Sequence, residues 1–407
     1  MRISSTLFFQ TGLNSINAQQ SDLMHLYQQI GSGQRMVTPA DDPLAAAQAI
    51  NISQSLSLNQ RFAANREVAN RNLGVEENTL NSVTGLMQDI KTALVQAGNG
   101  TLSDADRATL ADVLSNAKNT MLGLANSTDG SGQYLFSGSQ GGTQAYQADN
   151  TGAIKYQGDQ QQRKIQADQT RQIAGSDIGS DIFNRATPGT NSYLTAANVG
   201  NGGTAVISTP TITGQGTHAL VAYEITFLPS GNDYTVKNLT DTAASIVPGT
   251  YDPVLGSITL PNGVQVKLSG QPGPNDSFTV EPAATADLNV FDTLDQIIGA
   301  LSSSLQNGAD AAKFQNALVS SMQRMDASYD NVLTVRASVG ARMNEIEALD
   351  SNGALRTLSY RSQLSGLEDV DYYSATMQLE LRKSALEAAA LAFRKIQGTS
   401  LFNMGAN

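Results

Sequence analysis

The chain has 407 residues, a formal net charge of −11 and neither cysteine nor tryptophan. The missing cysteines exclude disulfides, thiolate nucleophiles and Cys-ligated metal centres, and the two histidines are too few for a three-histidine metal site within one chain. The acidic balance argues against binding to nucleic-acid phosphates, and no apolar run approaches the roughly 18–20 residues of a membrane-spanning helix. We therefore expect a protein that is not an enzyme, holds no cofactor or metal, and neither binds nucleic acid nor inserts into a membrane.

Glycine and proline divide the chain into three stretches. Residues 127–285 hold 21 of the 36 glycines and 9 of the 11 prolines. Because both residue types mark turns and disfavour helix interiors, the flanks are predicted to be helical and the middle to be β-rich. The expected fold is α+β, with a discontinuous α-helical bundle and coiled coil, formed by the N- and C-terminal arms, into which a β-rich middle domain is inserted.

The N-terminal arm is predicted to be a helix with a coiled-coil stripe. Its apolar residues are spaced alternately three and four apart, with Gln20 as the polar exception. The stripe consists of Leu13, Ile16, Leu23, Tyr27 and Ile30. An ordinary helix-bundle core would give the same pattern, but the position at the extreme end of the chain favours contacts between subunits.

A second helix is predicted to begin at Pro43 and to end at Asn99-Gly100. Asp41 and Asp42 precede its first turn. They could form a metal site or an acid–base pair, but the favoured interpretation is that they cap the helix and compensate the positive end of its dipole.

A capping box and a series of strand signals follow. Ser103 and Asp106 are spaced to cap a third helix that reaches about Asn126. β-Rich segments separated by turn residues then predict an antiparallel β domain. The expected strands are 219–228, 234–236, a hairpin over 257–268 around Asn262-Gly263, and a closing strand at 277–280.

The C-terminal flank repeats the spacing of three and four. A long helix is expected over 311–349, with a break in its stripe at Arg336 and a looser stretch around Asn352-Gly353. The final arm then carries a second regular stripe. This stripe consists of Ala375, Leu379, Arg382, Leu386, Ala389, Phe393 and Ile396.

The remaining titratable candidates have structural interpretations. His25 is expected to be solvated or at an interface, and His218 to lie at the surface beside a strand. The acidic patch of Glu368, Asp369 and Asp371 is expected to compensate the N-terminal charge of the last helix, with calcium binding as the alternative.

Four motifs in order along the chain are typical of one family. The segment IGSGQRMVTPADDP, residues 30–43, resembles the N-terminal signature of bacterial flagellin-type axial proteins. Flagellins usually continue the Asp-Asp pair with Ala, whereas Pro43 and the following LAAA resemble the flagellar hook-associated protein 3 (FlgL) branch. The other motifs of that branch are GQYLFSG (132–138), YQGD (156–159), and the ending from SGLEDVD (365–371) through Phe393 to SLF (400–402).

The resemblance covers about 1–165 and 286–407 and implies a structural subunit of the bacterial flagellum. Such a subunit would be an extracellular adaptor at the hook–filament junction, forming a ring between hook-associated protein 1 and flagellin. It would be secreted by the flagellar type III apparatus without a cleaved signal peptide and with an export chaperone as a further partner. Flagellin itself and a secreted carbohydrate-binding adhesin are the alternatives.

Three parts follow from the pattern and the resemblance together. Residues 1–42 and 365–407 would form terminal coiled-coil arms in an inner layer, 43–165 and 286–364 a helical bundle with a β-hairpin, and 166–285 an inserted outer domain. The two arms carry too few apolar residues to order themselves alone, so neighbouring subunits must complete their burial. The expected assembly interface pairs the N-terminal stripe with Leu379, Leu386, Phe393, Ile396, Leu401 and Phe402, while Asp41, Asp42 and Pro43 form the helix-cap signature.

Overall fold

The computed structural model describes residues 5–212, 220–230, 232–241, 243 and 246–404. The chain divides into two compact units, one made of Met1–Ala64 with Ala348–Asn407 and the other of Asn65–Glu347. The long helices α2 (Pro43–Ala97) and α6 (Gly308–Glu368) each contribute to both units. Within the described part of the chain, no helix combines the length and hydropathy of a membrane span.

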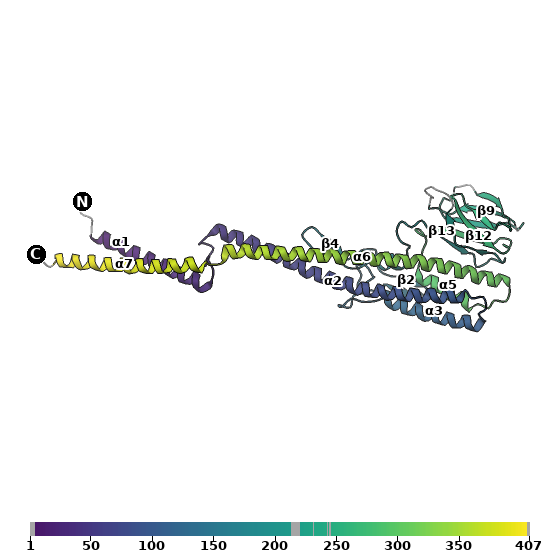
Figure 1. Cartoon of the computed structure of the whole chain (residues 1–407), viewed down its shortest axis with the longest axis horizontal. Helices are drawn as coiled ribbons and strands as arrows, with labels where there is room; N and C mark the ends of the chain where they lie inside the picture. The colour runs from purple at the N-terminus through teal and green to yellow at the C-terminus, as the bar shows by residue number, and fades with distance from the viewer. Residues whose placement is uncertain (1–4, 213–219, 231, 242, 244–245, 405–407) are drawn as a thin grey trace. The chain divides into compact units, whose positions relative to one another are not determined.

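The regular elements described in the first unit are all helices. It consists of α1 (Ser5–Ser32), α7 (Tyr372–Met404), the first part of α2 and the last part of α6. Helices α1 and α7 lie side by side (Figure 1) and run antiparallel. Gln34 and Asp369 form an antiparallel bridge where the two connections meet, and the Val370 N–H donates to the Gly33 carbonyl at 3.0 Å.

Helix α6 is continuous over 61 residues, so the looser stretch expected around Asn352-Gly353 is wrong. Gly353 is buried, and its carbonyl oxygen accepts hydrogen bonds from Asn59 Nδ2 at 2.8 Å and Thr357 Oγ1 at 3.0 Å. The glycine lets the side chain of Asn59 on α2 approach the α6 backbone. Tertiary contact therefore outweighs the low helix propensity of the Asn-Gly pair.

The second unit holds the helical core. Its helices are the rest of α2 and α6 together with α3 (Asp104–Ala125), α4 (Gly179–Phe183) and α5 (Val290–Ser302). Ser103 and Asp106 form the predicted capping box at the start of α3. In this unit α2 buries a side chain every three or four residues, most of them apolar and two of them charged, Arg66 and Glu76, as expected of a helix packed on one face. The fully buried ones include Leu73, Leu80, Met87 and Leu94.

Two small hairpins and an aromatic cluster lie beside this helical core. Strand β1 (Tyr146–Ala148) pairs with β2 (Ile154–Tyr156), and β3 (Lys164–Gln166) pairs with β4 (Gln172–Ala174). Tyr146 packs within ring-to-ring contact of Phe183 and Phe291, and all three rings are buried.

The β-rich domain consists of two antiparallel sheets enclosing one core. The larger sheet has the order β10-β9-β8-β13-β5 and the smaller one the order β11-β12-β6, with β7 also on β12. Alternate side chains from both sheets fill the core, among them Ile225, Phe227, Val266, Phe278 and Val280. The strands are β5 (Tyr193–Ala197), β6 (Val206–Ile207), β7 (Thr211–Ile212), β8 (Tyr223–Phe227), β9 (Asp233–Asn238), β10 (Val247–Thr250), β11 (Ser257–Thr259), β12 (Val264–Ser269) and β13 (Ser277–Pro282).

The predicted α+β architecture is confirmed, and the details of the β domain differ in part. The hairpin around Asn262-Gly263 is present, with Gly263 at φ +83°. The strand expected over 219–228 is limited to β8, and its first residue lies outside the described residues. The expected closing strand at 277–280 is present as β13, which pairs with β8 on one side and with β5 on the other.

Candidate assembly interface

Helix α1 presents a heptad seam to α7, and this seam is offset from the predicted stripe. The shielded positions alternate by four and three, and Leu26 is the best buried of them at 7 % exposure. Leu13 and Tyr27 are about half exposed, at 49 % and 52 %. The shielded positions of this seam are Gly12, Ile16, Gln19, Leu23, Leu26 and Ile30, and His25 and Gln29 beside it are half-buried as well.

Helix α7 uses the predicted stripe as its seam. Six stripe residues are buried or half-buried, namely Ala375, Leu379, Arg382, Leu386, Ala389 and Phe393. A Cβ on Gly12 would lie 3.2 Å from the Phe393 ring, so the glycine admits the aromatic side chain. Asp22 on α1 pairs with Arg382 on α7. The side chains of Ile396, Leu401 and Phe402 lie outside the described residues.

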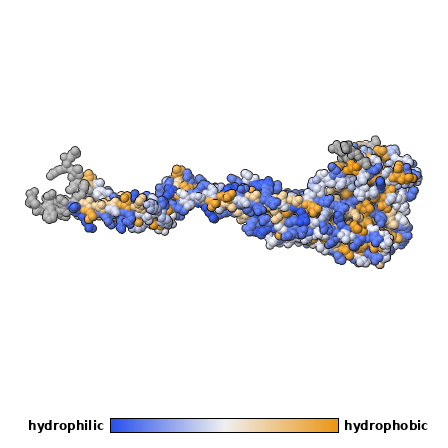
Figure 2. Space-filling model, viewed as in Figure 1, coloured by the Kyte–Doolittle hydropathy of each residue, from blue (hydrophilic) through white to orange (hydrophobic). Residues whose placement is uncertain are grey.

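A second apolar stripe lies on α7 away from α1. Tyr373, Met377, Leu381 and Leu391 are between 61 % and 78 % exposed. These positions are two residues from the seam positions, and two residues correspond to about 200° around a helix. These apolar residues are visible in the sequence, but their spacing is less regular than that of the stripe from Ala375 to Phe393, so only the latter is predicted from the sequence. Figure 2 shows apolar residues at the surface of the α1–α7 pair.

Helices α2 and α6 also expose apolar side chains within the first unit. Leu44, Leu355 and Leu358 are each between 66 % and 71 % exposed, and Ile50 is 59 % exposed. Single exposed apolar residues are ordinary, but contiguous ones mark a surface that binds another protein. All four helices of this unit thus carry apolar surface that the unit does not cover.

The signature loop between α1 and α2 orders both helix ends. Asp42 Oδ1 accepts the Ala45 N–H at 3.0 Å, the geometry of an N-cap for the helix that begins at Pro43. Asp41 instead accepts the backbone N–H groups of Val37 and Thr38 at 2.9 and 2.8 Å.

The carboxylate of Asp41 is stabilised by these contacts. The Thr38 N–H is the main cause that lowers the pKa of Asp41, and the His25 side chain contributes as well. His25 Nε2 lies 3.1 Å from Asp41 Oδ1 and is half-buried, so it joins α1 to the loop.

Of the three acidic residues before α7, only Asp371 contacts the described first turn of that helix through its side chain, and the Asp369 carboxylate accepts instead from the Ser365 hydroxyl. Asp371 Oδ1 accepts the Tyr373 N–H at 3.1 Å, as expected for charge compensation at a helix start. The Glu368 carbonyl accepts the Arg35 N–H, and the Arg35 side chain donates to the Leu367 carbonyl at 3.0 Å. No three His, Asp or Glu side chains in the described residues are placed to hold a metal ion. His218, the other candidate histidine, lies outside them.

Comparison with known proteins shows which family the chain belongs to. Residues 3–141 match the family model described as the bacterial flagellin N-terminal helical region. The flagellar hook-associated protein 3 of Salmonella typhimurium is 29 % identical over 406 residues, 99 % of each chain. The crystal structure of Xanthomonas campestris FlgL is 31 % identical with a TM-score of 0.66, over 77 % of this chain and 99 % of that one. The chain belongs to the flagellar hook-associated protein 3 (FlgL) family.

Membership of the FlgL family confirms the resemblance and distinguishes it from the nearest alternative. A B-type flagellin of Pseudomonas aeruginosa is 31 % identical, but over only 134 residues, 32 % of this chain and 26 % of the flagellin. The FlgL likeness instead includes the β domain and both ends. These relatives are all named as flagellar components and none of them as an enzyme.

Proposed function

We propose that this chain is the adaptor subunit of the hook–filament junction of a bacterial flagellum. It forms a homo-oligomeric ring outside the cell between hook-associated protein 1 and flagellin, after type III export without a cleaved signal peptide and with an export chaperone. Membership of the FlgL family supports this assignment, as does the description of a relative from Legionella pneumophila as a flagellar junction protein.

The observation that carries the proposal is the incomplete burial of the terminal helices. Among the described side chains, Leu26 is the only buried one in α1 and Ala375 the only buried one in α7. A two-helix pair with so little burial cannot offset the conformational entropy of ordering its residues. Neighbouring subunits would supply the missing contacts, so the arms fold when the subunit docks.

The interface residues divide into two sets under this proposal. Ile16, Leu23 and Ile30 join Leu379, Leu386 and Phe393 in holding α1 to α7. Leu13 and Tyr27 contact neighbouring subunits together with the outward stripe of α7. Ile396, Leu401 and Phe402 would extend the interface towards the C-terminal end.

Each of the three predicted parts of the chain would have its own place in the assembled ring. The arms at 1–42 and 365–407 would form the inner layer and the bundle at 43–165 and 286–364 its support. The domain at 166–285 would face outward. The absence of cysteine suits export as an unfolded chain, because no oxidation step is needed at the destination.

Removal of residues 1–36 tests the assignment. The shortened chain should remain folded in its second unit and stay monomeric, yet fail to restore filaments to a strain that lacks the protein. Restoration of filaments would contradict the proposal, and so would self-assembly of the purified full chain into long filaments, as a flagellin would show.

Two double variants of α1 distinguish the effect of losing its exposed apolar side chains from the effect of substituting any exposed residues of this helix. Leu13→Ser with Tyr27→Ser should reduce motility strongly, because both exposed apolar side chains of the stripe are lost. Asn14→Ser with Gln28→Ser alters two exposed polar positions of the same helix and should leave motility unchanged. Equal effects of the two variants would show that the apolar surface has no special role.

A further inference from the structure

Two connections cross between the sheets of the β domain at opposite edges. Residues 251–256 join β10 to β11, which are edge strands on one side. Residues 198–205 join β5 to β6, the edge strands on the other side. Four strand spacings separate β10 from β5, which corresponds to about 19 Å.

The first connection carries an exposed apolar knob, defined here as Val254 and Leu255. Val254 is 94 % exposed and Leu255 70 %, the former being the highest value among the exposed large apolar residues of the described chain. Asp252 Oδ1 accepts the Val254 N–H at 2.8 Å, and the Asp252 carbonyl accepts the Gly256 N–H at 2.8 Å. Gly256 has φ +62°, which closes the turn. The knob is therefore held away from the domain by an ordered turn.

The base of the turn is anchored in the domain core. Tyr251 is 3 % exposed, and its hydroxyl donates to the Leu268 carbonyl at 3.2 Å. Burying the knob in its own domain would require this anchor to break. An apolar pair that is rigidly presented loses little conformational entropy on binding, which suits it as an anchor for another surface.

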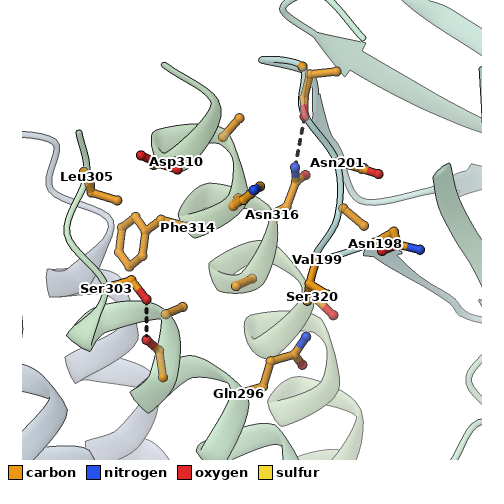
Figure 3. A pocket seen from close by; sticks show the side chains of 18 of the residues that line it. Asn198, Val199, Asn201, Gln296, Ser303, Leu305, Asp310, Phe314, Asn316 and Ser320 are labelled. Carbon is orange, nitrogen blue, oxygen red and sulfur yellow. Dashed lines mark hydrogen bonds between the residues drawn. The ribbon is translucent and has the colours of Figure 1, made fainter. Parts of the chain in front are cut away.

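The second connection lies over a cavity of about 550 Å³. Helices α5 and α6 form its other walls, with Phe314 and Ser320 directed into it (Figure 3). Small residues such as Gly299, Ala300 and Ala317 leave the space open. Its lining combines apolar residues with an equal number of polar ones, among them Asp295, Asp310 and Lys313, so it can take a ligand that has both an apolar part and polar groups.

Two details of the cavity indicate that an occupant is missing. Ser320 is 2 % exposed, and its hydroxyl has no hydrogen-bond partner among the described residues. Lys313, also in the lining, is exposed and makes no ion pair within the same part of the chain, so it is free to meet a negative charge. Of the two carboxylates in the lining, Asp295 is paired with Lys118 and Asp310 accepts the Gln306 N–H at 3.2 Å. A ligand with an apolar body, a backbone polar group and a negative charge beside it would satisfy the site.

We infer that the knob of one subunit inserts into the cavity of a neighbouring copy. The knob supplies the apolar body, the adjacent peptide carbonyls can accept from Ser320, and Asp252 supplies the charge opposite Lys313. Because knob and cavity lie at opposite edges of the domain, the contact is head to tail, and such contacts close into a ring when the rotation permits. The inference rests on the proposed function, since it requires copies placed side by side.

The absence of native cysteine permits a direct test in assembled flagella. The full chain carrying Leu255→Cys and Val199→Cys replaces the native protein in motile cells, and isolated flagella are treated with a short bis-maleimide. Val199 is on the rim of the cavity and 82 % exposed. Covalent dimers and higher multiples should form at about ten times the yield of the control pair Leu239→Cys and Val199→Cys, because Leu239 is exposed outside the knob.

Two results would overturn the inference while leaving the proposed function intact. One is a motile strain whose Leu255→Cys, Val199→Cys subunits remain monomeric after treatment. The other is equal dimer formation by Leu255→Cys alone, which would indicate contact between two knobs. Adding Ala317→Phe, which fills the cavity, should remove the multiples.

If the cysteine variants do not assemble, the same contact can be tested by replacing Leu255 with the photoreactive residue benzoylphenylalanine and illuminating the assembled flagella. Its adducts, mapped by mass spectrometry, should fall within residues 197–205 or 295–320 of another subunit, the two segments that line the cavity. Adducts confined to any other segment would overturn the inference.

Discussion

Glu76 is a carboxylate inside the second unit, on α2. It is fully buried, and its Oε1 accepts the Asp177 N–H at 2.9 Å, while Oε2 has no partner among the described residues. Arg342 on α6 pairs with Asp177, which also accepts from Gln162 Nε2 at 2.7 Å. Burial, and next the charge of Asp177, raise the pKa of Glu76 from 4.5 to about 8.

The raised pKa of Glu76 makes stability depend on pH. Between about pH 4.5 and 8 the folded chain holds a proton that the unfolded chain has released, so the free energy of unfolding falls as pH rises through this window. Glu76→Gln mimics the protonated form. It should flatten this dependence and, at about pH 8.5, raise the free energy of unfolding by an amount on the order of a few kcal/mol, with a higher unfolding midpoint as the observable.

Thermal unfolding of the purified chain followed by circular dichroism at several pH values measures the effect. Glu67→Gln, an exposed carboxylate on the same helix, is the matched control and should leave the pH profile unchanged. A profile for Glu76→Gln that parallels the native one would show that Glu76 does not titrate in this range.

Asp42 gives a second prediction at the residue scale. Asp42→Ala removes the acceptor for the Ala45 N–H and should destabilise the first turn of α2 by about 1 kcal/mol. In assembled flagella, hydrogen exchange at Ala45 and Ala46 should accelerate about fivefold. Asp42→Asn retains an acceptor and should behave as the native chain. Equal acceleration in both variants would contradict the capping role.

The pairing of α1 with α7 gives a prediction at the scale of elements. Asp22→Cys with Arg382→Cys replaces an ion pair that joins the two helices within one chain. Crosslinking in assembled flagella should join the helices within each subunit and give a compact monomer on a denaturing gel. Dimers would instead show that α1 pairs with α7 of an adjacent subunit.

The terminal helices show how far a sequence stripe predicts a helix seam. On α7 the stripe from Ala375 to Phe393 was found correctly, because its apolar residues lie on the seam itself. On α1 two of the predicted stripe residues, Leu13 and Tyr27, lie outside the seam, whereas Gly12 lies in it. Gly12 is there because the Phe393 ring needs the space, a demand that only the partner helix reveals.

The β domain was predictable in class and less so in detail. Hairpin signals identified β8, β9, β11, β12 and β13 because strands and turns are adjacent in sequence. Strands β6 and β7 have only two residues each, which is too short for an alternating pattern. The position of β13 between β8 and β5 depends on pairing with residues 80 or more positions away, which local periodicity does not encode.

At the scale of the whole molecule, the β domain should be dispensable for export and for docking through the terminal arms, although its excision also removes the knob and one wall of the cavity. The Ala283 N–H donates to the Ser192 carbonyl at 2.9 Å, so excision of 193–282 joins two adjacent backbone positions. The excised chain should be exported and restore swimming in dilute medium. Its unfolding midpoint should fall, because α6 loses the Arg324–Glu281 pair and the Gln323–Thr195 hydrogen bond. Loss of secretion would show that the domain belongs to the assembly core.

The dependence of the terminal arms on neighbours is tested most directly by hydrogen exchange on the free full-length subunit, observed by mass spectrometry. Amides of α1 and α7 should exchange within seconds, whereas those of α2 from Asn65 onward and of α6 up to Glu347 should stay protected for hours. Protection of α1 and α7 as strong as that of these core segments would contradict the claim that the arms fold only on assembly.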